Sequence, residues 1–242
     1  GPSGMSYQDM PDVTPGPDSV VIDVRAAGVC FPDLLLSKGE YQLKLPPPFI
    51  PGMEVAGVVS SAPDGSGFAV GQRVCASVLG GYAEQVSAPV ANVKPSPAEL
   101  DDAEAVSLLV NYHTMYFAFE RRAALRPGET VLVLGAAGGI GVAAIQVAQA
   151  MGARVIAVVH RSAAMEFVSS LGPDAVIPLG EGWAQAVRDA TGGRGVDVVV
   201  DPIGGPAFDD AIRVLATDGR LLVIGFAAGA IPTVKVKRSH GI

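Results

Sequence analysis

Hydrophobic and polar residues alternate in short runs through the first hundred residues. Residues 19–26 alternate apolar and polar side chains, and residues 55–60 and 72–79 form two further β-rich runs. Pro-Gly, Pro-Pro and Asp-Gly-Ser-Gly sequences separate these runs, as is typical of strands joined by turns. Residues 31–38 are rich in leucine and end at Gly39, which predicts one or two helical turns. The first part of the chain is therefore expected to be mainly β.

A different pattern begins at residues 97–102, where Pro-Ala-Glu-Leu-Asp-Asp predicts a helix start because acidic side chains favour the first helical turn. Helical periodicity follows to residue 124, and we predict one domain over residues 1–103 and a second over residues 104–242. Beyond residue 126, nearly continuous apolar runs alternate with helical patterns. The expected strands are residues 130–134, 154–159, 175–178, 196–201 and 220–226, and the expected helices are residues 139–151, 162–171, 183–191 and 208–216. This alternation predicts a parallel sheet covered on both faces, a doubly wound α/β domain.

One apolar stretch could be taken for a membrane span. Residues 130–153 contain no charged residue and are long enough to cross a bilayer as one helix. Their β-branched start stops at a glycine cluster, however, and Gln146 and Gln149 follow, so a strand, a turn and a helix explain the pattern better. Residues 1–10 also lack the basic and apolar regions of a signal peptide. We expect no membrane contact and a cytoplasmic location.

Composition and charge exclude several classes of protein. Hydrophobic residues make up 49% of the chain and charged residues 17%, which predicts a compact core instead of a disordered chain. The formal net charge is −7 and the Lys and Arg residues are scattered, so nucleic acid is not an expected partner. Cys30 and Cys75 are too few for a disulfide framework, and both thiols are expected to be free in a reducing compartment.

A glycine-rich turn follows the strand expected at residues 130–134. It reads Gly-Ala-Ala-Gly-Gly-Ile-Gly over residues 135–141, and in the G-x-G-x-x-G register Ala136, Gly138 and Gly141 take the three glycine places. Between a strand and a helix, such glycines let the backbone approach a pyrophosphate, and the helix start supplies free N–H groups. The alternative is a tight turn with a structural role alone. The expected cofactor-binding residues of the turn are Ala136, Gly138, Gly139, Ile140 and Gly141.

The end of the next expected strand bears on the choice of cofactor. An acidic residue there would bind the ribose 2′-hydroxyl of NADH, but the sequence is Val-His-Arg-Ser at residues 159–162. Arg161, with His160 and Ser162 beside it, can instead bind a 2′-phosphate through charge-assisted hydrogen bonds. The alternative is that Arg161 is an ordinary solvated side chain. We predict NADPH as the cofactor.

The order of these segments resembles the quinone oxidoreductase branch of the medium-chain dehydrogenase/reductase superfamily, the zeta-crystallin-like enzymes. The resemblance rests on residues 26–29, 39–41, 51–54 and 111–114, followed by the glycine turn. It implies a GroES-like, mainly β first domain, a Rossmann-type NADPH-binding second domain, and a homodimer that acts on a small-molecule substrate. Compared with that family, the chain is expected to be truncated at both ends and to lack the end of its second domain.

The resemblance also implies roles for single residues. Tyr41 is expected in the substrate cleft, where its phenol donates a hydrogen bond or a proton to the developing oxyanion. The alternative is that Tyr41 covers an apolar patch beside Phe49. Asn111 and Thr114 are expected near the cofactor, and the alternative is that their side chains bond only to the helix backbone. Gly225 and Phe226 are expected to end a strand on the carboxyl side of the sheet, where ligands bind.

Zinc-dependent relatives of this family carry Cys and His ligands in the same segments. Cys30 stands at the place of a zinc thiolate, but Met53 stands at the place of the histidine, and a thioether is a poor ligand beside imidazole. Cys30 and Glu54 give two ligands at best, so no metal is expected and Cys30 is interpreted as a thiol of the substrate cleft. The sequence therefore predicts a zinc-independent, NADPH-dependent reductase of quinones or other α,β-unsaturated carbonyls. An enoyl-thioester reductase and a non-catalytic NADPH-binding protein are the alternatives.

Overall fold

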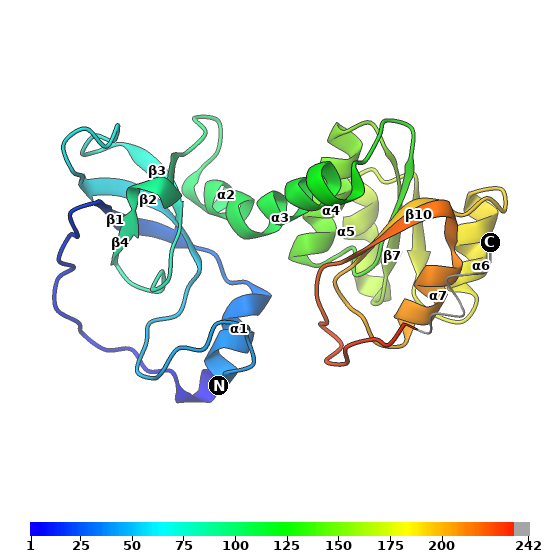
Figure 1. Cartoon of the computed structure of the whole chain (residues 1–242), viewed down its shortest axis with the longest axis horizontal. Coiled ribbons are helices and arrows are strands. Elements are labelled where there is room, and N and C mark those ends of the chain that lie inside the picture. Colours follow the sequence, from blue (N-terminus) through cyan, green and yellow to red (C-terminus); the bar gives the residue numbers. More distant parts are fainter. Residues whose placement is uncertain (235–242) are drawn as a thin grey trace. The chain divides into compact units, whose positions relative to one another are not determined.

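The chain forms two compact units, Gly1–Val110 and Asn111–Ile242 (Figure 1). The computed structural model describes residues 1–234, so the last part of the second expected domain, residues 235–242, lies outside the described residues. The domain boundary predicted between residues 103 and 104 falls within helix α2 (Asp102–Ser107), shortly before the junction of the two units.

The first unit contains a five-stranded antiparallel sheet. Its strands, in the spatial order β4-β1-β2-β3-β5, are β1 (Ser19–Ala27), β2 (Glu54–Ser61), β3 (Arg73–Ser77), β4 (Gln85–Pro89) and β5 (Val93–Pro95). The three strands expected from the sequence are confirmed. The short strands β4 and β5 are additional, and each is held by pairing with β1 or β3 instead of by an apolar run of its own. The expected helix α1 (Phe31–Lys38) ends at Gly39, whose φ of 70° is the left-handed conformation that glycine favours.

A helical segment follows the first sheet. It consists of α2, a π-helical turn η3 (Leu108–Tyr112), α3 (His113–Phe117) and a second π-helical turn η4 (Ala118–Ala123). Its start is a capping box: the Asp101 carboxylate accepts from the Glu104 N–H at 2.8 Å, and the Glu104 carboxylate accepts from the Asp101 N–H at 3.0 Å. The helix start predicted from the acidic residues is therefore confirmed, whereas nothing in the periodicity predicted the π turns.

The second unit contains a five-stranded parallel sheet in the order β10-β9-β6-β7-β8. Its strands are β6 (Thr130–Val133), β7 (Arg154–Val159), β8 (Ala175–Pro178), β9 (Val196–Asp201) and β10 (Leu215–Val223). Its helices are α4 (Gly139–Ala150), η5 (Ser162–Ala164), α5 (Met165–Ser170), α6 (Trp183–Ala190) and α7 (Ala207–Arg213). The last expected strand begins earlier than predicted, because Leu215 already pairs with Val196 of β9.

Side chains of the parallel sheet alternate between two separate cores. Val131 and Val133 of β6 pack with residues of α4 and α5, whereas Leu132 and Leu134 pack with residues of α6 and α7. Figure 1 shows α4 and α5 on one side of this sheet and α6 and α7 on the other. The doubly wound fold is confirmed, and its strand order reverses between β6 and β9, where such sheets bind ligands at their carboxyl edge.

The apolar stretch at residues 130–153 forms β6, the glycine turn and α4, as the sequence predicted. Within residues 1–234, no helix has both the length and the apolar character needed to cross a membrane.

Candidate functional site

The glycine turn connects β6 to α4 at the switch point of the sheet. Gly135 has a φ of 60°, a left-handed conformation that favours glycine, and a Cβ atom there would also press on the Ile203 side chain, 3.1 Å from its Cδ1 atom. The Gly138 N–H donates to the Gly135 carbonyl at 2.9 Å, and Gly138 is the N-cap of α4 without a side-chain cap. The first N–H groups of α4 therefore remain available to an anion.

Close packing explains the other glycines of the turn. A Cβ atom on Gly141 would lie 2.6 Å from the Ala136 Cα atom, so Gly141 lets α4 approach the end of β6. Ala136 itself is fully buried in the core, and Ile140 packs against the same core. The first tight-turn position is thus Gly135 and not Ala136 as the predicted register had it, and Ala136 lies behind the binding surface.

Asn111 lies against this turn. A Cβ atom on Gly139 would be 2.7 Å from Asn111 Nδ2, which means that the Asn111 amide occupies the space beside Gly139. Both residues belong to the second unit, so the expected closeness of Asn111 to the cofactor turn holds in the structure. Thr114 is half-buried one helical turn further along and does not line the pocket described next.

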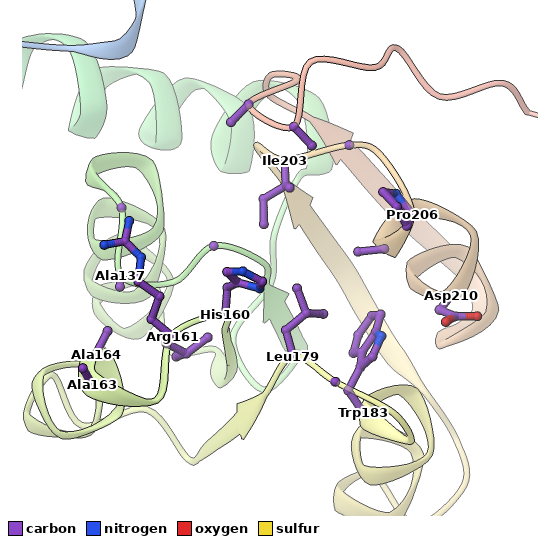
Figure 2. A pocket seen from close by; sticks show the side chains of 18 of the residues that line it. Ala137, His160, Arg161, Ala163, Ala164, Leu179, Trp183, Ile203, Pro206 and Asp210 are labelled. Atoms are coloured by element: carbon purple, nitrogen blue, oxygen red, sulfur yellow. The ribbon is translucent and has the colours of Figure 1, made fainter.

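A cavity of about 1100 Å³ extends from the glycine turn along the carboxyl ends of the parallel strands (Figure 2). Its size is that of a cofactor or ligand site. It is lined by Gly135, Ala137 and Gly138 of the turn, by Val159, His160 and Arg161 after β7, by Leu179 and Gly180 after β8, and by Ile203 and Gly204 after β9. The cavity therefore lies where the fold predicts a nucleotide, and the glycine cradle has room for a pyrophosphate.

The two charged side chains of this cavity, Arg161 and Asp210, lie on opposite sides of it (Figure 2), and only Asp210 has an ion-pair partner among residues 1–234. His160 and Arg161 are exposed on its surface, and the Arg161 guanidinium has no hydrogen bond or ion pair to any residue of the described range 1–234. Asp210 also lines the cavity, but it pairs with Arg213 at 2.8 Å and lies across the cavity from Arg161 in Figure 2. A cation without a partner in that range thus lies at the end of β7, where a nucleotide's 2′ substituent is expected.

Of the twelve predicted cofactor residues, only Gly138, His160 and Arg161 line the cavity, and Ser162, Gly225 and Phe226 are among those outside it. Ser162 is exposed and begins the turn η5. Gly225 and Phe226 follow β10, but Ala227 and Ala228, the next residues of that loop, line the cavity in their place. The predicted strand end was wrong: β10 ends at Val223, so Gly225 and Phe226 lie in the loop after the strand and not at its end.

Several lining residues were missed by sequence reasoning. Phe167 comes from α5, Trp183 from α6 and Pro206 from the start of α7, and all three reach the cavity from beyond the strand ends. Trp183, the only tryptophan of the chain, is buried with its edge toward the cavity (Figure 2). The rule that ligands bind at the carboxyl ends of strands could have indicated Leu179 and Ile203, but not the helical residues.

A buried polar cluster lies in the first unit around Cys30. The Cys30 N–H and thiol both donate to Asp33 Oδ2 at 3.0 Å, and Asp33 Oδ1 accepts from the Gly52 N–H at 3.2 Å. Burial, aided by the Asp33 carboxylate, raises the pKa of the Cys30 thiol to about 12. Cys30 is therefore a protonated hydrogen-bond donor. It and Cys75 are both free thiols, as predicted.

Glu54 completes this cluster. Its carboxylate accepts from the Val110 N–H at 2.8 Å, and a Cβ atom on Gly28 would collide with it. Burial raises the pKa of Glu54 above its ordinary value, and the Asp33 carboxylate adds to that shift. Among the described residues, no three His, Cys, Asp or Glu side chains are grouped so that they could hold a metal ion.

Two tyrosines of the first unit differ in their surroundings. Tyr41 lies half-exposed in the bend after α1, where its N–H donates to the Leu35 carbonyl at 3.2 Å. The Tyr82 hydroxyl is buried, and burial, together with the nearby Asp33 carboxylate, raises the pKa of Tyr82. Tyr41 is thus half-exposed, whereas the Tyr82 hydroxyl is buried, and the role of Tyr41 in a substrate cleft stays a prediction.

Family models match both units of the chain. The model described as Alcohol dehydrogenase GroES-like domain matches residues 16–98, and the model described as Zinc-binding dehydrogenase matches residues 139–240. These two matches agree with the antiparallel sheet of the first unit and the parallel sheet of the second.

Known proteins resemble the chain over most of its length. Quinone oxidoreductase-like protein 2 of Bos taurus is 38% identical over 92% of this chain, and the chain spans 66% of that protein's length. The crystal structure of a probable oxidoreductase from Mycobacterium abscessus is 65% identical, with a TM-score of 0.88, over 92% of this chain and 71% of that one. The quinone oxidoreductase from Thermus thermophilus, solved alone and in complex with NADPH, is 37% identical, with a TM-score of 0.80, over 96% of this chain and 72% of that one.

Proposed function

This chain belongs to the quinone oxidoreductase family of the medium-chain dehydrogenase/reductase superfamily, and we propose that it reduces quinones or other α,β-unsaturated carbonyls with NADPH. The observation that carries the proposal is the cavity of the second unit, which joins a glycine cradle to Arg161, unpaired within residues 1–234. NADPH was expected from the sequence, and it is also the cofactor in the Thermus thermophilus complex.

Different residues of the second unit bind different groups of NADPH. The N–H groups at the start of α4 bind the pyrophosphate beside Gly138, near which a Cβ atom would meet only the Gly135 carbonyl, at 3.4 Å. Arg161 binds the 2′-phosphate, and Asn111 supports the turn at Gly139. When bound, NADPH supplies the hydride that reduces the electrophilic carbon of the substrate.

The remaining task of the protein is to stabilise the oxygen of the substrate. As the substrate carbon is reduced, negative charge builds on the conjugated carbonyl oxygen. We assign to Tyr41 the donation of a hydrogen bond, and then of the phenolic proton, to that oxygen, with solvent restoring the proton of Tyr41.

We also propose that this chemistry needs no zinc. Met53 stands where a histidine ligand would be needed, the Cys30 thiol keeps its proton at neutral pH, and Glu54 is already bonded to the Val110 N–H. Purified protein is expected to contain less than about 0.1 zinc ions per chain, since a catalytic site needs three ligands and an open position. Zinc measured at one ion per chain, lost together with activity on chelation, would contradict this.

A single assay compares the candidate functions. We expect the protein to oxidise NADPH in the presence of small quinones and enones, measured by the loss of nicotinamide absorbance. Turnover with enoyl thioesters and none with quinones would make it an enoyl-thioester reductase. Saturable NADPH binding without turnover of any carbonyl would make it a cofactor-binding protein. Tighter binding of NADH than of NADPH would contradict the proposed cofactor.

Further expectations, from the family resemblance for the homodimer and from the sequence for location and partners, remain predictions. A homodimer is proposed, and light scattering coupled to size-exclusion chromatography measures it directly. A cytoplasmic location and the lack of nucleic-acid or membrane partners likewise remain to be tested, by microscopy of the tagged full-length protein and by binding assays with DNA, RNA and vesicles.

A further inference from the structure

Strand β9 ends at Asp201, a residue that neither the glycine turn nor the cavity lining includes. Its side chain is fully buried. Its Oδ1 atom accepts hydrogen bonds from the N–H groups of Ile203 and Gly204, both at 2.8 Å. An aspartate that binds the backbone two and three residues further on stabilises a tight turn in the chain that follows it.

The main chain of Asp201 orders a second loop. Its carbonyl accepts from the N–H groups of Ile224 at 2.8 Å and Gly225 at 3.4 Å. The two loops then bind each other directly: the Pro202 carbonyl accepts from the Ala227 N–H, and the Ile203 carbonyl accepts from the Ala228 N–H. Asp201 therefore forms hydrogen bonds to both loops, at residues 202–206 and 224–229.

These two loops form one wall of the cofactor cavity. Ile203, Gly204, Ala227 and Ala228 line it, and the Ile203 side chain also packs beside the bend at Gly135 (Figure 2). Gly204 has a φ of 66° and the next residue a φ of 62°, so the first loop holds two consecutive left-handed residues. Such a backbone needs an acceptor for its buried N–H groups, and Asp201 Oδ1 supplies it.

We propose that Asp201 is a positioning residue for the nucleotide: it holds both loops in the shape in which the wall meets the glycine cradle. This role rests on the proposed function, since it concerns the same NADPH site. Asp201 Oδ2 is buried and bonds to none of the described residues, so Oδ1 carries the side-chain part of the role alone. Asparagine, which keeps Oδ1, can therefore replace aspartate here, whereas alanine cannot.

Three variants at this position test the proposal through the NADPH dissociation constant, measured by Trp183 fluorescence. Asp201→Asn is expected to stay within about threefold of wild type, and Asp201→Ala to weaken binding about tenfold or more, because a buried N–H loses its acceptor. Asp201→Ser keeps one hydroxyl acceptor and should lie between them. If the alanine variant does not fold, the comparison of serine with asparagine decides.

Val199→Ala is the matched control for a loss of stability alone. Val199 is fully buried in the same strand, but it packs in the core on the α6 and α7 side. This variant should unfold at lower urea yet bind NADPH as wild type does. Hydrogen exchange without nucleotide should rise over residues 202–206 and 224–229 in Asp201→Ala and remain unchanged over those residues in Val199→Ala.

The outcomes separate the two proposals. NADPH binding by Asp201→Ala within threefold of wild type, or equal weakening by Val199→Ala, would overturn the role of Asp201 while the proposed function stands. Lack of NADPH binding by the wild-type protein would overturn the proposed function and this role with it. Increased exchange at residues 202–206 in the alanine variant would then still show that Asp201 orders the loop.

Discussion

Arg161 is the residue on which the choice between the two nicotinamide cofactors depends. Its guanidinium is exposed at the cavity and unpaired within residues 1–234, so it can meet a 2′-phosphate without breaking an existing ion pair. Arg161→Ala is expected to raise the NADPH dissociation constant about tenfold, since the lost interaction is charge-assisted but partly screened by water. The NADH dissociation constant should not change.

Two further arginine variants make that measurement specific. Arg161→Lys keeps the charge without the planar fork and should fall between wild type and Arg161→Ala. Arg121→Ala removes an exposed arginine that does not line the cavity, and it should leave both constants unchanged. Equal weakening of NADH and NADPH by Arg161→Ala would show that this side chain does not contact the 2′-phosphate.

Tyr41 is tested at the same scale through the rate of turnover. Removing its hydroxyl in Tyr41→Phe should lower kcat at least about 100-fold if the phenol acts as the general acid, because that is the usual contribution of such a group. NADPH binding should be unaffected. Tyr7→Phe is the control, since the Tyr7 side chain is 88% exposed. An unchanged kcat in Tyr41→Phe would leave Tyr41 as a packing residue beside Phe49.

At the scale of elements, an ion pair fixes the edge strand of the parallel sheet. Both terminal nitrogens of Arg220 on β10 contact the Glu129 carboxylate, which precedes β6, at 2.7 and 2.8 Å. Hydrogen bonding to Arg220 holds the pKa of Glu129 below its ordinary value of 4.5. A lowered pKa in the folded state adds stability that is present above the unfolded value and is lost as the pH falls through the folded value.

Glu129→Gln should therefore destabilise the protein in a pH-dependent way. We expect the free energy of unfolding in urea to drop by about 1–2 kcal/mol at pH 7, because both partners are less than one-third exposed. The difference from wild type should shrink as the pH falls below 4.5. Arg213→Gln, which breaks a more exposed pair, should cost less than about 0.5 kcal/mol. A penalty for Glu129→Gln that is the same at about pH 3.5 would rule out the ionic origin.

At the scale of the whole molecule, the two units carry different probes. Trp183 lies in the second unit, and both thiols, Cys30 and Cys75, lie in the first. NADPH at about 100 times its dissociation constant should raise the free energy of the unfolding transition reported by Trp183 by about 2.7 kcal/mol. NADH at the same concentration should raise it less. A Trp183 transition that NADPH does not shift would contradict a nucleotide site in the second unit.

Labelling of the buried Cys75 thiol during the same titration shows whether the first unit follows. If labelling and fluorescence shift together, the two units unfold cooperatively. If only the fluorescence shifts, the nucleotide stabilises the second unit alone. Either result fits the proposed site. The result shows whether the unfolding free energies of the Glu129 and Asp201 variants refer to the second unit alone or to both units.

Local pattern determined much of this protein without a structure. Strand β9 and helix α1 were predicted at their observed bounds, because buried strands and short amphipathic helices depend on nearest-neighbour periodicity. The glycine turn, and the presence of Arg161 in place of an acidic residue after β7, also followed from the sequence, because each is a short contiguous segment. They were sufficient to predict the doubly wound fold of the second unit, and they are the basis of the proposed NADPH site.

Only the tertiary structure decided which residues meet around that turn. Gly135, with a φ of 60°, is the tight-turn residue in place of Ala136, and Ile203 from the loop after β9 packs against it. Trp183 reaches the cavity, and Asp201 orders two loops, through contacts between segments far apart in the sequence. Such contacts depend on how strands are ordered and helices packed, and no local periodicity encodes that order.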